Sequence, residues 1–349
     1  MRIAIITDAW EPQVNGVVNT LRGTQRCLSR LGHQVLLLTP NDFRTFACPG
    51  YPEIRLACKP YRGVAHALSA FAPDCIHIAT EGPMGLAARR YCLRGGLDFT
   101  SAYHTRFPEY LSARAMLPSA LTYRWLQWFH GPSKAIMVPT PRIAAVLEQR
   151  GFKHLALWSR GVDTELFQPF AREHAGIERP VYLYVGRLAV EKNVEAFLEM
   201  RLPGTKWVIG DGPSRDALER RYPDAHFLGA KSNDALPSYY NSADVFVFPS
   251  RTDTFGLVML EAMACGVPVA AYPVEGPLDV VKNGVSGVLH PDLTQACINA
   301  LLLRRRDARK HALNFSWESA TQQFLQHLHP VRPTAVSQTP YLLSLWQSI

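Results

Sequence analysis

The hydrophobic positions of this chain alternate between short apolar runs and segments with helical spacing. Arg2–Ile6 and Val35–Leu38 are apolar runs with the length of a buried strand. Between them, the apolar residues of Val18–Leu31 recur at helical spacing, and Gly32 follows as a natural stop. Strands and helices that alternate in this way predict a parallel sheet covered by helices on both faces.

The same alternation runs on both sides of a polar, irregular stretch, residues 169–180, which we interpret as an interdomain linker. Before the linker, further strands are expected at Cys75–Ile78, Phe99–Tyr103 and Ala135–Val138, and helices at Gly85–Arg94, Leu121–His130 and Pro141–Gly151. After it, strands are expected at Val181–Val185, Trp207–Ile209, Val245–Phe248 and Val267–Ala271, and helices at Val194–Met200, Arg215–Tyr222, Leu257–Ala264 and Thr294–Arg305. The chain is therefore predicted to be an α/β protein with two Rossmann-like parallel-sheet domains, 1–168 and 181–316, facing across a cleft.

The composition narrows the class of protein. Of the 349 residues, 47% are hydrophobic and 19% charged, which excludes disordered, collagen-like and coiled-coil proteins. No apolar stretch approaches the roughly 18–20 residues of a membrane-spanning helix, and we expect no secretory signal. The seven cysteines are odd in number and include no C-x-x-C pair, which indicates a reducing, cytoplasmic environment. Cys265, in an Ala-Cys-Gly-Val run, is expected to be a small buried side chain.

The positive charge is unevenly distributed. Residues 1–168 carry 19 basic and 11 acidic side chains, which accounts for the whole net charge of +8. Such a surface can attract phosphorylated substrates or anionic lipid headgroups. Nucleic acid is not expected as a partner, because this half has no zinc finger, no RNA-recognition signature and no dense basic run.

Candidate chemical groups follow several predicted strands. Gly16 opens the first helix and would let backbone N–H groups approach an anion, although an ordinary turn explains it equally well. His104 directly follows a strand and would face the cleft, unless it is a satisfied core histidine. Arg187 and Lys192 share one strand-to-helix turn, where two cations would neutralise a diphosphate or simply be solvated.

The most informative block is residues 249–270. A predicted strand ends at Phe248, a loop carries Asp253, and a helix begins near Gly256, so that its free N–H groups could hold a phosphate. Glu261 lies within this helix. The two carboxylates could address two parts of one extended ligand, Asp253 a sugar and Glu261 a ribose diol.

This block resembles the signature of the retaining GT-B glycosyltransferases of family 4. That signature has two acids separated by seven residues, followed by a Leu-Glu-Ala-Met-Ala-Cys-Gly-x-Pro-Val-like run. Here the acids are Asp253 and Glu261, and the run continues through Ala262–Val269. The first acid is usually Glu. Residues 250–256 are similar to a subgroup that glycosylates membrane lipids, comprising sulfoquinovosyl diacylglycerol synthases and mannosyl- and glucuronosyl-lipid transferases.

The resemblance implies roles for individual residues. His104 would contact the transferred sugar, Arg187 and Lys192 would bind the diphosphate and stabilise the leaving group, and Asp253 would hydrogen-bond sugar hydroxyls. Glu261 would bind the ribose, Gly16 would lie under the phosphates, and the base would be read near Gly229. The catalytic residues implied are His104, Asp253, Arg187 and Lys192. The donor-binding residues implied are Gly16, Arg187, Lys192, Gly229, Asp253, Thr254, Phe255, Gly256, Leu257, Val258 and Glu261.

The expected reaction moves a hexose from GDP-mannose, a UDP-hexose or UDP-glucuronate to a lipid or glycan hydroxyl, with retention of configuration. A diacylglycerol-type or glycolipid acceptor is favoured. The sequence has no D-x-D, so cations and a helix N-terminus must replace a metal, and no metal or cofactor is expected. The alternatives are a catalytically inactive nucleotide-sugar-binding protein and a GT-B nucleotide-sugar epimerase.

The first domain is expected to bind the acceptor, at an anionic membrane surface on the inner face of the cell membrane. The cations proposed for this surface are Arg89, Arg90, Arg94, Arg114 and Arg124. The apolar residues Leu121, Trp125, Leu126, Trp128 and Phe129 could form an interfacial face or pack in the core. The resemblance also implies that residues 317–349 return to the first domain, with helices at Trp317–His329 and Tyr341–Ser348.

Overall fold

The computed structural model describes residues 1–13, 15–48, 51–104, 119–172 and 176–331. Its first sheet is parallel, with strand order β2-β1-β5-β6-β7-β8. These strands are β1 (Arg2–Ile6), β2 (Gln34–Leu38), β5 (Cys75–Ile78), β6 (Thr100–Ala102), β7 (Ile136–Val138) and β8 (Leu155–Leu157). A 3-10 turn, η1 (Pro40–Asp42), and an antiparallel hairpin of β3 (Thr45–Cys48) and β4 (Tyr51–Ala57) intervene between β2 and β5.

Alternating burial explains why the first sheet is a central layer. Ile3 and Ile5 enter the hydrophobic cluster on one face of β1, whereas Ala4 and Ile6 enter the cluster on the other face. A strand that is apolar on both sides is stable only where helices cover both faces of the sheet. The helices of this domain are α1 (Gly16–Arg30), α2 (Tyr61–Phe71), α3 (Pro83–Gly95), α5 (Ser119–His130) and α6 (Pro141–Gln149).

The second sheet is also parallel, with strand order β11-β10-β9-β12-β13-β14. Its strands are β9 (Val181–Val185), β10 (Thr205–Ile209), β11 (His226–Gly229), β12 (Val245–Phe248), β13 (Val269–Ala271) and β14 (Gly287–Leu289). The connecting elements are η2 (Val190–Lys192), α7 (Val194–Leu198), α8 (Arg215–Arg221), α9 (Leu236–Ser242), α10 (Leu257–Ala264), α11 (Pro277–Val280), α12 (Leu293–Ala300) and α13 (Arg305–Ala312). The prediction of two Rossmann-like α/β domains is confirmed, whereas the single helix predicted at Thr294–Arg305 is wrong, because α12 ends at Ala300.

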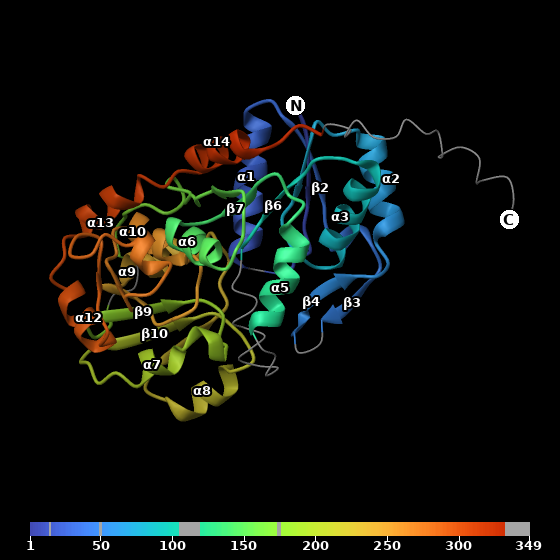
Figure 1. The fold of residues 1–349 in the computed structure, drawn as a ribbon. Coiled ribbons are helices and arrows are strands. Elements are labelled where there is room, and N and C mark those ends of the chain that lie inside the picture. The colour runs from blue at the N-terminus through green and yellow to red at the C-terminus, as the bar shows by residue number, and fades with distance from the viewer. Residues whose placement is uncertain (14, 49–50, 105–118, 173–175, 332–349) are drawn as a thin grey trace, which may run out of the picture.

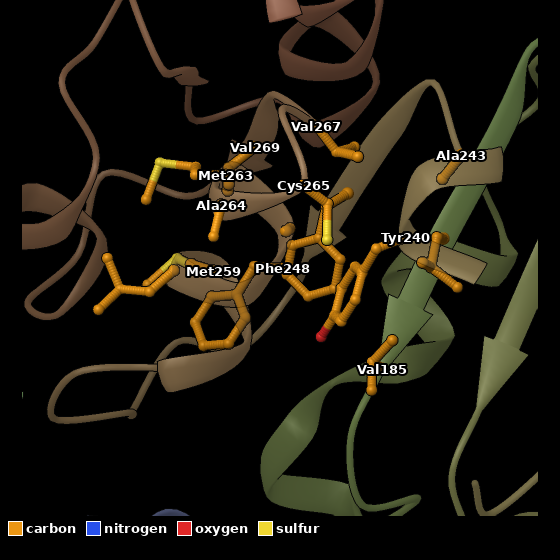
Figure 2. Close-up of a cluster of buried hydrophobic side chains, with 14 of the residues drawn as sticks. Val185, Tyr240, Ala243, Phe248, Met259, Met263, Ala264, Cys265, Val267 and Val269 are labelled. Carbon is orange, nitrogen blue, oxygen red and sulfur yellow. The ribbon is translucent and has the colours of Figure 1, made fainter. Parts of the chain in front are cut away.

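The main core of the second domain anchors the element that carries the signature. Side chains from β9, α9, β12 and α10 meet in one cluster, which Figure 2 shows with Val185, Tyr240, Phe248 and Met259 labelled. Cys265 is fully buried in this cluster, as predicted. Because α10 is buried on nearly all sides, its first turn is held in a fixed position at the end of β12.

The last described helix, α14 (Trp317–His327), leaves the second domain and packs on α1 of the first (Figure 1). A Cβ atom on Gly23 of α1 would lie 2.6 Å from Cδ2 of Trp317, so only glycine permits this approach. Phe324 of α14 packs against Trp158, with 4.8 Å between the ring centroids. The second predicted terminal helix, Tyr341–Ser348, lies outside the described residues.

Candidate active site

The N-terminus of α10 lies at the carboxyl end of β12, where a parallel sheet presents its ligand-binding edge. Gly256 is the N-cap residue, with φ of +85°, a left-handed conformation that favours glycine. A Cβ atom there would lie 2.7 Å from Met259 Cε and 2.9 Å from Phe248 Cζ. Since glycine supplies no capping side chain, the first N–H groups of α10 can serve an anionic ligand.

An ion pair stands beside this helix start. Lys192, the last residue of η2, places its Nζ 2.5 Å from Asp253 Oδ1. Both side chains are largely buried, with 24% of Lys192 and 15% of Asp253 exposed. Among the described residues, Asp253 Oδ2 is buried without a hydrogen-bond partner. The carboxylate therefore fixes the ammonium group with one oxygen and keeps the other for a further donor.

Arg187 occupies the same strand-to-helix turn, two residues after β9 ends. Its carbonyl oxygen accepts a hydrogen bond from the Tyr184 hydroxyl at 2.8 Å, and its side chain is half-buried. Burial raises the pKa of Tyr184 well above its usual value, so this hydroxyl stays protonated and holds the turn. Two cations, Arg187 and Lys192, thus follow one strand end, as the diphosphate prediction requires.

Among the described residues, the first domain approaches this site at His104 and at Gly16. Thr254 Oγ1 donates a 2.8 Å hydrogen bond to the backbone oxygen of His104, which lies just past β6. A Cβ atom on Gly16, the first residue of α1, would lie 3.7 Å from Leu257 Cδ1. The starts of α1 and α10 therefore meet across the interface between the two domains.

The helix start at Gly16 already has a capping group. Asn15 Oδ1 accepts from the N–H groups of Val17 and Val18, each at 3.0 Å. These two N–H groups have a partner, which distinguishes the start of α1 from that of α10. The expectation that Gly16 lies under the phosphates rests on its place opposite Leu257 and stays a prediction.

His104 is buried, with 9% of the residue exposed. Its Nδ1 lies 3.0 Å from Nη2 of Arg160, and its ring meets Trp158 edge-on, with 5.4 Å between centroids. Burial first, and then the charge of Arg160, lower the pKa of His104 well below its usual value. The imidazole is therefore neutral at physiological pH.

Glu261 lies inside the core rather than at its edge. Only 7% of the residue is exposed, and Oε2 accepts a hydrogen bond from the Tyr240 hydroxyl at 2.9 Å. Burial raises the pKa of Glu261 to about 7, although the hydrogen bond from Tyr240 opposes this change. The ribose contact expected for Glu261 stays a prediction, and the structure adds a buried partner.

The remaining predicted donor residues are distributed around this core. Phe255 is buried against Phe315, with ring centroids 6.3 Å apart, and Val258 is half-buried in the first turn of α10. Gly229 ends β11 with φ of +72°, and its carbonyl oxygen accepts from the N–H of Gly210 at 3.0 Å. The contact of Gly229 with a base stays a prediction.

Sequence reasoning missed three groups at the carboxyl edge of the first sheet. Asp8 accepts from the N–H groups of Met84 and Gly85, at 2.8 and 3.3 Å, and so caps α3 from outside that helix. Glu81 pairs with buried His130 at 3.3 Å. Arg160 follows β8, a strand too short to be recognised. Their shared signal is a charged residue two or three positions past the end of an apolar strand.

Comparisons with known proteins agree with this architecture. Residues 14–166 match the family described as Glycosyltransferase Family 4, and residues 179–304 match Glycosyl transferases group 1. Sucrose-phosphate synthase from Thermosynechococcus elongatus superimposes with a TM-score of 0.77 at 23% identity, over 93% of this chain and 97% of that structure. Anabaena HepE in complex with UDP and glucose gives 0.71 at 18% identity, over 93% and 98%.

Curated relatives extend over nearly the whole chain. A GDP-mannose-dependent alpha-mannosyltransferase of Mycobacterium tuberculosis is 29% identical, over 97% of this chain and 99% of its own length. The sulfoquinovosyl transferase of Arabidopsis thaliana is 30% identical, over 88% of this chain and 69% of its own length. The fold, the block from Asp253 to Glu261 and these relatives agree, and the chain belongs to family 4 of the glycosyltransferases.

Proposed function

We propose that this glycosyltransferase moves a hexose from a nucleoside diphosphate sugar to a hydroxyl of a lipid or glycan, with retention of configuration and without a metal ion. The observation that carries the proposal is the Lys192–Asp253 pair at the start of α10, opposite His104. Relatives named GDP-mannose-dependent alpha-mannosyltransferase and alpha-monoglucosyldiacylglycerol synthase support a hexose donor and a lipid acceptor.

The charge distribution favours departure of a diphosphate. As the glycosidic bond to the donor breaks, negative charge develops on the phosphate oxygens. Lys192 and Arg187 follow β9, and the N–H groups of α10 follow the neighbouring strand β12, so together they supply positive charge at one edge of the sheet. Asp253 fixes Lys192 before the reaction begins. Donors that are already oriented lower the barrier, because they need no rearrangement when the charge appears.

Retention follows from the position of the acceptor relative to the leaving group. We propose that the acceptor hydroxyl attacks from the face that the diphosphate leaves, since the resemblance identifies no protein nucleophile. Asp253, with one free carboxylate oxygen, would hold sugar hydroxyls during an oxocarbenium-like transition state. His104 would contact the same sugar from the first domain.

A membrane surface is the proposed location of the acceptor. Exposed side chains on α3 and α5 combine apolar and basic groups: Leu86, Arg90, Leu93, Arg94, Leu121, Arg124 and Trp128. We call this set the α3–α5 face. No helix among the described residues is long and apolar enough to span a bilayer. A surface of this kind would hold the enzyme at anionic lipid without insertion.

Part of the predicted membrane surface is corrected by the structure. Arg89 is 9% exposed, donates to the backbone oxygens of Phe129 and Trp128, and stacks on the Trp128 ring at 3.9 Å. It satisfies backbone carbonyl groups in the last turn of α5 rather than facing lipid. Leu126 and Phe129 are fully buried, so their packing role is confirmed, and Trp125 is half-buried. Arg114 lies outside the described residues.

A transfer assay tests the proposed reaction. The full-length protein is incubated in EDTA with GDP-mannose, UDP-glucose or UDP-glucuronate and with diacylglycerol or glycolipid acceptors, and the anomeric configuration of the product is read by NMR. The proposal expects a product whose anomeric configuration matches that of the donor. Inverted product, or transfer only after divalent metal is restored, contradicts it. Nucleotide binding without turnover supports an inactive binding protein, and epimerised donor supports an epimerase.

A further inference from the structure

A buried arginine beside His104 has no counterpart in the roles implied by the family signature. Arg160 is 4% exposed and lies three residues past β8, two strands away from His104. Its Nη1 donates to the backbone oxygen of Trp158 at 2.6 Å, and its guanidinium stacks on the Trp158 ring at 4.7 Å. Among the described residues, no carboxylate pairs with it. Its Nη2 instead reaches His104 Nδ1 at 3.0 Å.

This contact determines the proton position on His104. A guanidinium donates hydrogen bonds and cannot accept them, so the Nδ1 atom that it contacts must be the acceptor. A neutral imidazole with a free electron pair on Nδ1 carries its proton on Nε2. The Nε2 atom of His104 is buried, and it has no hydrogen-bond partner among the described residues. Within the part of the chain that the structure describes, the site thus contains one oriented N–H donor without a partner.

We propose that Arg160 is a positioning residue that fixes His104 as the Nε2–H tautomer, so that His104 donates a hydrogen bond to an oxygen of the transferred sugar. The sugar contact rests on the proposed function, whereas the tautomer does not depend on it. A histidine held in this way cannot take a proton from the acceptor at Nε2. Its contribution is directional binding of a hydroxyl or ring oxygen, and the acceptor proton must leave by another route.

The surroundings of His104 favour the neutral state over a wide pH range. Among the described residues, the titratable groups that face it are Arg160 from the segment after β8, His77 from β5 and His130 from α5. Each of these groups lowers the pKa of His104. Trp158, which packs on both His104 and Arg160, carries no charge. The tautomer is therefore expected to persist throughout the pH range of a transfer assay.

Nitrogen NMR of the full-length protein tests the tautomer directly. Long-range ¹H–¹⁵N spectra of histidine-labelled protein are recorded from pH 5.5 to 8.5, and His104→Gln assigns the signals of His104. The inference expects a pyridine-type Nδ1, a pyrrole-type Nε2 and no titration across this range. A pyridine-type Nε2, or conversion to the imidazolium within the range, overturns it.

Variants of Arg160 separate positioning from structural support. Arg160→Met keeps most of the side-chain length but removes the donors, and His104 is expected to become a mixture of tautomers. Arg160→Lys retains a charged donor and should restore the wild-type spectrum in part. Arg89→Lys is the matched control, because Arg89 is also buried, donates to backbone oxygens and stacks on a tryptophan. The ¹⁵N signals of His104 in Arg89→Lys should equal those of the wild-type protein.

Kinetics then test whether Arg160 acts through His104. Arg160→Met should lower kcat by about tenfold, the change expected when one hydrogen bond to the substrate is lost. In a His104→Ala background, the same substitution should have no further effect, because its target is absent. Independent, additive losses overturn the positioning role. A protein that shows the expected tautomer yet transfers no sugar contradicts the proposed function alone.

Discussion

Asp253 occupies a position where the length and charge of one side chain determine what the site can hold. With glutamate, the usual residue here, the carboxylate would reach further. With aspartate, Oδ1 lies 2.5 Å from Lys192 and Oδ2 is buried and free. We therefore propose that the acid combines two tasks: it orients a cation for the diphosphate, and it presents an acceptor to sugar hydroxyls.

Removing the charge of Asp253 should impair catalysis more than folding. Asp253→Asn keeps the shape but loses the charge that orients Lys192, and we expect kcat to fall by about 10- to 100-fold, near the lower limit seen when one oriented electrostatic group is removed. Steady-state transfer assays measure this change. Asp211→Asn is the matched control, an aspartate after β10 whose side chain is 63% exposed, and it should retain wild-type kcat. Equal activity in the two variants would contradict the role of Asp253.

Glu261 makes a separate prediction about stability and pH. Its pKa is raised to about 7 from an ordinary 4.5, so the folded state binds the proton more tightly than the unfolded state. The resulting stabilisation is present below pH 4.5 and is lost as the pH rises through 7. Glu261→Gln cannot ionise and should gain up to roughly 3 kcal/mol over the wild type at pH 8.

Calorimetry at two pH values measures this effect. The difference in Tm between Glu261→Gln and the wild type should be largest at pH 8 and should shrink towards pH 5. The comparison between variant and wild type removes the contribution of every other titrating group. A Tm difference that is the same at both pH values would contradict the raised pKa.

At the scale of elements, apolar patterning predicted the long, buried strands and the helices between them. β1 and β9 were recognised because every residue of their cores is aliphatic or aromatic. The edge strands β8, β11 and β14 were missed, since each has only three or four residues and is partly exposed. The hairpin of β3 and β4 was missed for a related reason, because its sequence has no continuous apolar run.

The start of α10 gives a prediction at this scale. Gly256→Ala should destabilise the fold more than Gly284→Ala, although the two glycines have similar φ angles of +85° and +75°. A Cβ atom at 256 would strike Phe248 and Met259, whereas a Cβ atom at 284 meets nothing within 4 Å. The backbone strain common to both variants costs about 1–2 kcal/mol. Any further loss of stability in Gly256→Ala therefore measures the steric clash with Phe248 and Met259.

Urea unfolding measures the loss of stability in both variants, and nucleotide titration measures their affinity for the ligand. Gly256→Ala should also weaken nucleotide binding, because it shifts the first turn of α10, and Gly284→Ala should not. Equal free energies of unfolding for the two variants would contradict the close packing at Gly256.

At the scale of the whole molecule, the sequence predicted two Rossmann-like domains and the return of the last helix to the first domain, but not which residues contact each other across the site. Contacts between residues 150 positions apart, such as Thr254 with His104, have no local signal in the sequence. The contact of Arg160 with His104 likewise has no local signal in the sequence. It depends on the order of the strands, because β7 lies between the strands that precede the two residues. The block of residues 249–270, in contrast, could be recognised from the sequence, because its residues are contiguous in the chain.

The distribution of charge between the domains yields a prediction for membrane binding. Replacing Arg90, Arg94 and Arg124 of the α3–α5 face by Gln should weaken binding to anionic vesicles by roughly 100-fold, at about 1 kcal/mol for each cation near the surface. The matched control replaces Arg304, Arg306 and Lys310, which are exposed on the second domain. Vesicle flotation at low salt measures both. Equal losses in the two triple variants would contradict docking by the first domain.

The central claim is that protein cations, not a metal ion, hold the diphosphate of the donor. Its most direct test is the shift in Tm produced by GDP, UDP, ADP and CDP, with and without EDTA, for the wild type and Lys192→Ala. We predict that GDP or UDP raises the Tm equally in both buffers, because ligand binding stabilises the folded state. Lys192→Ala should reduce this shift strongly. A shift that disappears in EDTA, or one that Lys192→Ala leaves unchanged, would contradict the account.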